Sequence, residues 1–453
     1  MFKDRSILIK RLILFFISVS VLTLGFYRNE WAAVGKKWFY DWKDYQDFMV
    51  IGRLVETRQH GVFSYSGFIG IGDGDSWLDA GNGLMEHQVE VYLNNGSFEK
   101  YASYDTEPAA YGVVFGLIDG FTNFSPGVNL KLFRGIVSIL TATALACFIT
   151  WVGIEFNFFA AGLTLLFAMF SEWFGLFGGS IYWNIWAYYL PFLATLFYFS
   201  GTSAFQNYSF KKIFLFTFIS VFITGLMRGF MFETTALIML TVPVVYFAIK
   251  DGWDRAGFIE RFLQVSFSAL AGTFSALLVL IVQITFVEGS LGAAFAHIQD
   301  TLMKRSIANP DQFSGIMADS LRASRLEVIN TYLQGRAINL NGFFNTNIPW
   351  LEVPYLSIFI FFAASTLLFF FREYAIERAF LKNKKSLALI ASTWFSALAP
   401  LSWFILFKAH SYIHTQVNFL LWQLPFTLFG FALCGYILSN LFQRNPVTGK
   451  TTA

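Results

Sequence analysis

Cysteine and charge are both scarce in this sequence. Two cysteines occur among 453 residues, Cys147 and Cys434, and both lie within apolar runs. The polar segments contain none, which excludes a disulfide framework and a thiolate-bound metal site there. Charged residues make up 13% of the chain, whereas a soluble domain carries about a quarter. This shortage of charge excludes an ordinary soluble enzyme of this length.

Apolar residues fill the chain instead. They make up 56% of it, and 57 of them are phenylalanine. They recur in continuous runs of about 20 residues, the length at which an α-helix spans the hydrocarbon core of a membrane. The strands of a membrane barrel would show alternating segments of about 10 residues instead. The sequence therefore predicts an all-α polytopic membrane protein.

Ten spans are predicted, with both termini in the cytoplasm. They cover residues 1–27, 133–153, 157–177, 184–201, 213–228, 232–249, 264–287, 353–371, 387–407 and 416–440. Residues 1–27 are predicted to form a retained signal anchor, because basic residues precede an apolar run that no small-residue cleavage site follows. The short segments assigned to the cytoplasm are rich in Lys and Arg, as the positive-inside rule requires. All five histidines fall on the other side. The predicted order after the anchor is a first extracytoplasmic loop (28–132), spans two to seven (133–287), a second long extracytoplasmic loop (288–352), spans eight to ten (353–440) and a cytoplasmic tail (441–453).

The segment Asp41–Gly61, DWKDYQDFMVIGRLVETRQHG, follows the first span and is dense in ionisable groups. At helical spacing Trp42, Tyr45 and Met49 form an apolar stripe, while Asp44 and Asp47 are neighbours on another face. A carboxylate at the lipid–water boundary has a raised pKa and is well placed to take a proton from a hydroxyl. The alternative is an interfacial amphipathic helix whose acids only face water.

The segment DYQDFMVIGRLVETRQHGVFS, together with the topology, resembles the GT-C superfamily of membrane glycosyltransferases. The resemblance implies a polyprenyl-phosphate-linked sugar as donor, a glycan or lipid as acceptor, and an inverting transfer. It implies that Asp44 or Asp47 is the catalytic acid, although the adjacent acidic pair of many members is missing. The neighbouring residues Arg53, Glu56, Arg58 and His60 are then expected to bind substrate.

Two other segments, SWFILFKAHSYIHTQ and SIYWNIWAYYLPF, resemble bacterial membrane proteins of cell-surface polysaccharide assembly. The expected location is therefore the bacterial cytoplasmic membrane, with the active site facing the periplasm or the cell exterior. The expected partners are membrane lipids and the lipid-linked sugar, and no nucleic acid is expected.

A lipid phosphate leaving group needs cationic donors at the outer face. Arg228 at the end of a span is one candidate, because an intramembrane arginine is costly to keep without a function. The alternative is that Arg228 only pairs with Glu233 or extends to the headgroups. A second candidate group, for phosphate or sugar, is Lys408 with His410 and His414.

Metal and cofactor sites find little support. The spacing of His410 and His414 suits zinc, but the HEXXH pattern and a nearby third ligand are absent. The segment Gly70–Gly83 carries three aspartates among glycines, yet it fails the calcium-loop pattern at Trp77 and Leu84. The sequence therefore predicts no cofactor.

Two other functions fit a polytopic protein of this kind. A lipid-glycan flippase or transporter would place ionisable residues near the membrane midplane and show two related halves. An O-antigen-type polymerase would concentrate arginines in the second long loop, where Arg322, Arg325 and Arg336 lie. The large early loop argues against the polymerase, and the absence of two related halves argues against the transporter.

Overall fold

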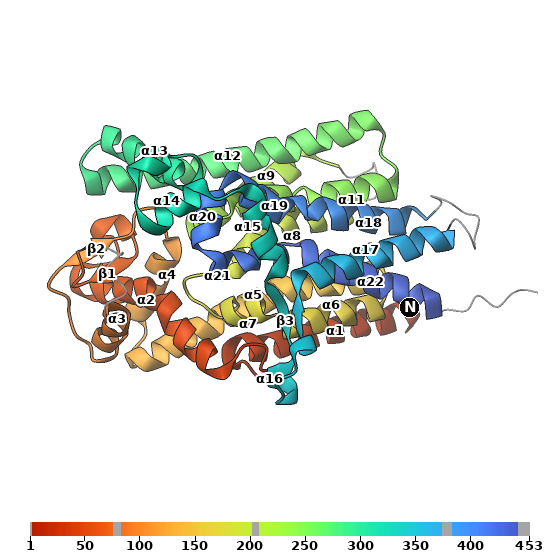
Figure 1. Ribbon diagram of the computed structural model, residues 1–453, viewed down its shortest axis with the longest axis horizontal. Coiled ribbons are helices and arrows are strands. Elements are labelled where there is room, and N and C mark those ends of the chain that lie inside the picture. The colour runs from red at the N-terminus through yellow and green to blue at the C-terminus, as the bar shows by residue number, and fades with distance from the viewer. Residues whose placement is uncertain (1, 76–82, 202–207, 374–382, 443–453) are drawn as a thin grey trace, which may run out of the picture.

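The computed structural model describes residues 2–75, 83–201, 208–373 and 383–442. The side chains of residues 2–6 and of Asp44 lie outside that description. Most of the described chain is helical, and the long helices run side by side along the longest axis of the molecule (Figure 1).

The bundle consists of apolar helices. Continuous apolar sequence favours helices because a helix satisfies every internal backbone group within its own segment. Each of the ten predicted spans coincides with one helix or with consecutive helices. The bundle helices are α1 (Phe2–Arg28), α5 (Pro126–Glu155), α6 (Phe158–Phe170), α8 (Ile185–Gly201), α9 (Phe210–Arg228), α10 (Glu233–Met239), α11 (Val242–Asp251), α12 (Arg255–Glu288), α17 (Tyr355–Phe371), α18 (Lys384–Ser396), α19 (Leu398–Leu406) and α22 (Phe426–Phe442).

Within the described ranges, six helical segments are long and apolar enough to cross a membrane. A seventh is added if the bent pair Thr415–Gln423 and Phe426–Leu441 is one span. Shorter apolar helices such as α6 and α17 complete the bundle. The prediction of an all-α multi-pass membrane protein is thereby confirmed, and the count of ten spans stays a prediction.

The two long predicted loops fold into short elements. The first contains a small antiparallel ribbon in which Gly70 pairs with Ser103 and Gly72 with Tyr101. Its elements are α2 (Lys36–His60), η1 (Ser64–Gly67), β1 (Gly70–Gly72), α3 (Leu84–Leu93), β2 (Tyr101–Ser103) and α4 (Ala110–Phe121). The second contains α13 (Leu291–Ser306), η3 (Pro310–Gln312), α14 (Gly315–Arg322), α15 (Arg325–Gln334), β3 (Arg336–Asn339), α16 (Asn341–Phe344), η4 (Pro349–Leu351) and β4 (Glu352–Pro354), with β3 and β4 paired.

The elements α2, α3, β1, β2, α13 and α14 gather at one end of the bundle, and the N-terminus lies at the opposite end (Figure 1). We call the end where these elements gather the loop-bearing end. Three short elements complete the chain: α7 (Glu172–Phe177), α20 (Lys408–Ile413) and α21 (Thr415–Asn418), which leads into η6 (Phe419–Gln423).

Ion pairs and a hydrogen bond between bundle helices involve basic residues near the helix ends. Glu155, at the end of α5, contacts Lys250 at 2.8 Å and Lys385 at 3.5 Å. Arg372 donates a hydrogen bond to the carbonyl oxygen of Asn440 at 2.7 Å. These contacts join α5, α11, α18, α17 and α22, so these basic residues also hold helices together.

Candidate functional site

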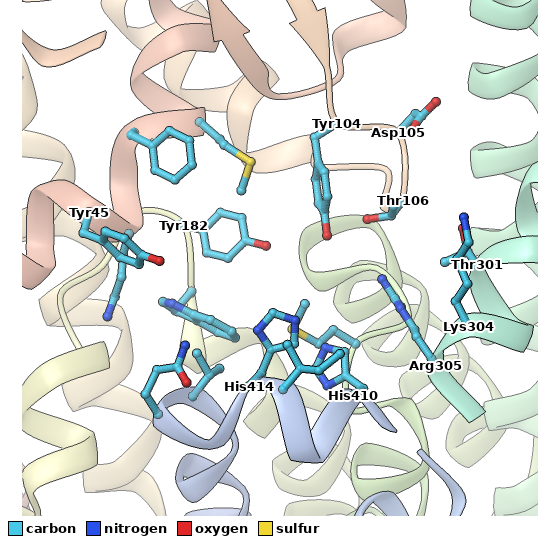
Figure 2. A pocket seen from close by; sticks show the side chains of 18 of the residues that line it. Tyr45, Tyr104, Asp105, Thr106, Tyr182, Thr301, Lys304, Arg305, His410 and His414 are labelled. Atoms are coloured by element: carbon cyan, nitrogen blue, oxygen red, sulfur yellow. The ribbon is translucent and has the colours of Figure 1, made fainter. Parts of the chain in front are cut away.

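A cavity of about 590 Å³ lies between the two long loops and the α20–α21 segment. Its lining comes from the first half of α2, residues 104–106 after β2, the turn before α8, α13, and the residues around α20 and α21. Figure 2 shows Tyr45 and Tyr182 on one side of this cavity, Thr301, Lys304 and Arg305 on the other, and the two histidines between them. Met85, Met231 and Met317 complete the lining. No single stretch of sequence could have built this site, because segments far apart in the sequence meet there.

One wall of the cavity is aromatic and rich in methionine. The rings of Trp42 and Tyr45 stack with centroids 4.8 Å apart, and Met49 lies one turn further along α2. Tyr182 and Trp183 continue this wall from the turn before α8. Such a surface suits a sugar ring or an acyl chain, because aromatic faces bury area at a small entropic cost.

The opposite wall is cationic. Arg305, in the last turn of α13, lines the cavity. Within the part of the chain that the structure describes, it forms no ion pair with a carboxylate. A guanidinium beside open space is a ready donor for a phosphate or carboxylate group.

His410 and His414 face Arg305 across the cavity, and their ring centroids are 4.6 Å apart. Nδ2 of Asn418 lies 3.3 Å from Nδ1 of His410, an arrangement that favours the tautomer with the proton on Nε2. Burial lowers the pKa of His410, and the neighbouring His414 and Arg305 add to this effect. Burial and Arg305 also lower the pKa of His414, to about 4. Both imidazoles are therefore neutral at pH 7.

Stability should fall as the pH falls from about 6.5 to about 4. The pKa of His414 is near 6.5 in the unfolded chain and about 4 in the folded one. Between these values the unfolded chain binds more protons, so acid favours unfolding. We expect His414→Gln to reduce this slope, measured as the thermal midpoint in detergent across that range. An unchanged slope in His414→Gln would contradict the assignment.

The carboxylates that line the cavity already have partners. Asp105 lies 3.4 Å from His297, and Asp300 lies 2.5 Å from Lys304, four residues further along α13. Burial raises the pKa of Asp105, and His297 opposes that rise. The Asp105–His297 pair links the first long loop to α13 at the edge of the cavity.

Arg228 lies behind the aromatic wall and is completely buried. Its guanidinium donates to the carbonyl oxygen of Tyr182. The acid whose charge acts on Arg228 is Glu107. Glu233 instead accepts a hydrogen bond from Thr273. The rings around Arg228 are those of Tyr111, Tyr182, Trp183 and Tyr188, at 5.0 to 5.9 Å from the guanidinium carbon.

Glu107 comes from the segment before α4 and packs against Gly229. Gly229 has φ +57°, and a Cβ there would lie 2.3 Å from the Cβ of Glu107, so a side chain would be excluded. The hydroxyl of Tyr111 donates to Glu107 at 2.6 Å. Burial raises the pKa of Glu107, and the charge of Arg228 opposes that rise. Arg228 and Glu107 are thus both buried, with Arg228 behind the aromatic wall. The Arg228–Glu233 pairing considered as an alternative does not form, and Glu233 accepts from Thr273.

Asp47 does not line the cavity. It is fully buried and accepts from Nε of Arg134 at 2.8 Å, from the hydroxyl of Ser180 at 2.9 Å and from the amide of Ile181 at 3.0 Å. These donors occupy the carboxylate and hold the turn before α8 against α2. Asp44, the other predicted acid, lies on the same helix, but its side chain is outside the described residues.

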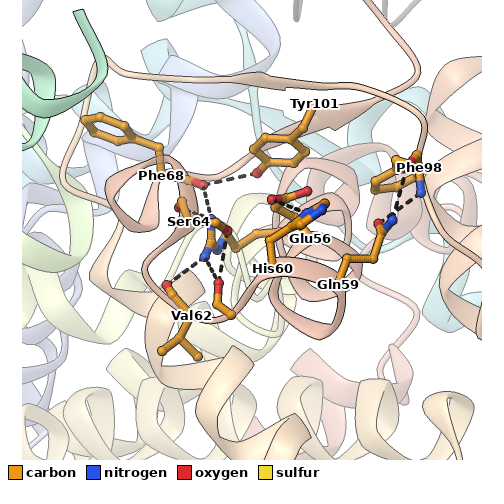
Figure 3. A network of polar contacts seen from close by, with 10 residues as sticks. Glu56, Gln59, His60, Val62, Ser64, Phe68, Phe98 and Tyr101 are labelled. Atoms are coloured by element: carbon orange, nitrogen blue, oxygen red, sulfur yellow. Dashed lines mark hydrogen bonds and ion pairs between the residues drawn. The ribbon is translucent and has the colours of Figure 1, made fainter. Parts of the chain in front are cut away.

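Glu56 and His60, two of the predicted substrate residues in the second half of α2, lie in a polar network apart from the cavity (Figure 3). Arg53 is buried and donates to the carbonyl oxygens of Ser64, Gly61 and Val62, which fixes the loop that follows α2. Glu56 contacts His60 at 2.9 Å. Arg58 contacts Asp119 of α4 at 2.7 Å. None of the four lines the cavity, so the contacts of the second half of α2 brace the first long loop.

Lys408 also has hydrogen-bond partners within the protein. Its ammonium group donates to the carbonyl oxygens of Leu321 at 2.6 Å and Ala323 at 2.7 Å, at the end of α14. Of the three residues predicted in this segment, the structure therefore brings His410 and His414 into the cavity and leaves Lys408 outside its lining.

The late-loop arginines considered for a polymerase are engaged elsewhere. Arg322 contacts Asp311 at 3.0 Å, and Arg325 donates to the carbonyl oxygen of Ile405. Arg336 pairs with the buried Glu172 and with Glu352. Arg305 of α13 is the arginine of the second long loop that lines the cavity, and the sequence analysis did not single it out.

Among the described residues, no group of three or more His, Cys, Asp or Glu side chains could hold a metal ion. In the aspartate-rich segment, Asp73 contacts His87 at 2.8 Å and Asp75 contacts Lys100. Residues 76–82 of that segment, including Asp79, lie outside the described residues.

Comparison with known proteins gives no relative. No family model matches the chain, and neither a curated protein nor a solved structure matches it. Its function is therefore argued from the cavity itself.

Proposed function

We propose that this chain is a membrane glycosyltransferase that moves a sugar from a polyprenyl-phosphate donor to a surface glycan or lipid acceptor. The reaction takes place in the cavity at the loop-bearing end, on the periplasmic side of a bacterial cytoplasmic membrane. The observation that carries the proposal is Arg305, a cation without a carboxylate partner among the described residues, which faces two neutral histidines and an aromatic wall in one cavity. The resemblance of the segment Asp41–Gly61 to the GT-C superfamily supports the same reaction.

In the proposed reaction the acceptor oxygen attacks the anomeric carbon of the sugar. The bond from that carbon to the phosphate oxygen breaks, and the lipid phosphate departs with the electron pair. Arg305 stabilises the negative charge that develops on the phosphate, and Nε2–H of His410 is a second donor. The aromatic wall formed by Tyr45 and Trp183 binds the sugar.

The acceptor proton needs a base. Asp44 is our first candidate, because it lies on α2 one turn before Phe48, which lines the cavity. Asp47 would first have to release Arg134 and the donors of the turn before α8. His414 is the second candidate, since it is neutral and lines the cavity.

The test is transfer of a labelled sugar from polyprenyl phosphate by the purified protein in detergent. We expect transfer by the wild type and a loss of roughly 10²-fold or more when the base is replaced. Parallel assays of Asp44→Asn and His414→Gln identify the base. Failure of the wild type to use any lipid-phosphate sugar, in a correctly folded preparation, would refute the proposal. Unchanged rates in Asp44→Asn, Asp47→Asn and the double variant would exclude both aspartates.

A glycan polymerase of the O-antigen type is the second candidate. Its support is the position of Arg305, because this cation comes from the second long loop and not from α2. A polymerase would use a lipid-linked oligosaccharide both as donor and as acceptor. Product length separates the two functions: single-sugar addition favours the transferase, and a ladder of products favours the polymerase.

A further inference from the structure

The long helix α12 exposes a continuous apolar stripe. Side chains spaced three or four residues apart lie on one face of a helix, and on α12 this face is outward. Exposed large apolar side chains on globular proteins are scattered, so an unbroken stripe on a bundle helix indicates contact with lipid. The stripe includes Phe267, Leu270, Phe274, Leu278, Val282 and Phe286, each at least 45% exposed.

The length of α12 places its last turns at the headgroups. Between Arg261 and Glu288 the helix carries no charged residue. About 20 residues of helix span a hydrocarbon core about 30 Å thick. Measured from Arg261, this length ends near Val282. Phe286 and the end of α12 therefore reach the headgroup region, and the apolar stripe still continues there.

The next helix, α13, folds back along α12. Gly289 ends α12 with φ +76°, and the hydroxyl of Ser290 caps α13 by accepting from the amide of Ala293 at 3.1 Å. Ala294 and Ile298 of α13 pack in one apolar cluster with residues 277–284 of α12. The helix α13 thus lies beside the outermost part of the apolar stripe.

The exposed face of α13 also carries large apolar side chains, beside the polar Gln299. Leu291, Phe295 and Leu302 are 54%, 55% and 52% exposed, and spacings of four and seven residues place them on one face. Another face of the same helix carries Thr301, Lys304 and Arg305 into the cavity. A single helix therefore stands between the apolar exterior and the cavity.

We propose that α13 is immersed in the headgroup region of the leaflet at the loop-bearing end, with Leu291, Phe295 and Leu302 against the acyl chains. The occupant of this face is membrane phospholipid, because the face continues the lipid-facing stripe of α12. The helix then forms the wall between bilayer and cavity. Its cavity face holds Lys304 and Arg305 at the level of lipid phosphates, so a phosphate-bearing lipid can reach the cavity along α13 without leaving the interface. This proposal does not rest on the transferase activity.

The test places a fluorophore on α13 of the full chain in phospholipid vesicles. Cys147 and Cys434 are first replaced by alanine, and a single cysteine is introduced as Phe295→Cys or Leu302→Cys. The matched control is Ala296→Cys, an exposed residue on a different face of the same turn. Each labelled protein is quenched by nitroxide-bearing lipid and, separately, by aqueous iodide.

We expect lipid nitroxide to quench the label at residues 295 and 302 more strongly than at residue 296, by a factor of roughly three or more. Iodide should show the opposite order. Equal iodide quenching at all three positions would mean that the face is in water and would overturn the proposal. Protection of residues 295 and 302 from both quenchers would mean that a protein covers the face, and would also overturn it. Because no substrate is added, the outcome is independent of the enzyme assay.

Discussion

Replacing Arg305 with alanine is expected to lower kcat/KM for transfer from a polyprenyl-phosphate sugar by roughly 10²–10³-fold, the loss typical of removing one preorganised donor to a developing anion. Arg305 lines the cavity and, among the described residues, has no carboxylate partner. Its removal leaves the departing phosphate without its main cation. The measurement is the initial rate with purified protein at several donor concentrations.

A matched control lies on the same loop. Arg322→Ala removes an exposed arginine that contacts Asp311 at 3.0 Å and lies outside the cavity, so the rate should stay within a factor of about two. Arg305→Lys keeps the positive charge but loses the planar guanidinium that can donate two parallel hydrogen bonds, so an intermediate rate is expected. If Arg305→Ala retained the wild-type rate, the phosphate would have to bind elsewhere and the proposed chemistry would be wrong.

Replacing Asp47 with alanine is expected to destabilise the fold by about 3–5 kcal/mol, as is usual when one partner of a buried ion pair is removed. The carboxylate contacts Arg134 of α5, and it also accepts from Ser180 and the amide of Ile181 in the turn before α8. Its loss takes an acceptor from these donors and from the amide of Tyr182. The measurement is denaturant unfolding in detergent, followed by tryptophan fluorescence.

The comparison residue is Asp41, an exposed aspartate on the same helix. Asp41→Ala should change stability by no more than about 0.5 kcal/mol. Asp47→Asn retains one acceptor oxygen and should lie between the two. A catalytic but non-structural Asp47 would give the reverse pattern, with full stability and no transfer, and that result would refute the structural role.

The membrane-spanning helices could be predicted from the sequence because hydropathy is a local property. Each run of about 20 apolar residues must form a helix in lipid wherever its neighbours lie. The predicted spans at residues 133–153 and 213–228 accordingly fall within α5 and α9. The breaks within spans were not predicted. Ser171, for example, caps a new helix α7 inside the third predicted span by accepting from the amide of Phe174.

The site was predicted only in part, because charge partners are long-range. His410 and His414 were singled out by their own spacing, and both line the cavity. Arg53 was also expected to bind substrate, from the family resemblance. It donates instead to carbonyl oxygens of the loop after α2 and holds that loop in place. A charged residue in the sequence looks the same in either role, since the role depends on which groups fold against it.

By itself the sequence determined that this is a helical multi-pass membrane protein with two long polar loops, because apolar length and charge distribution act segment by segment. Only the tertiary structure decided which ionisable groups are free for chemistry. Asp47 meets Arg134 from 87 residues further along the chain and is occupied by it. Arg305 is brought by the fold-back of α13 to the two histidines and stands open to the cavity. Burial and pairing are properties of the packed chain, so Asp47, which stood out in the sequence, has a structural role, and Arg305, which did not stand out, is a cation that lines the cavity.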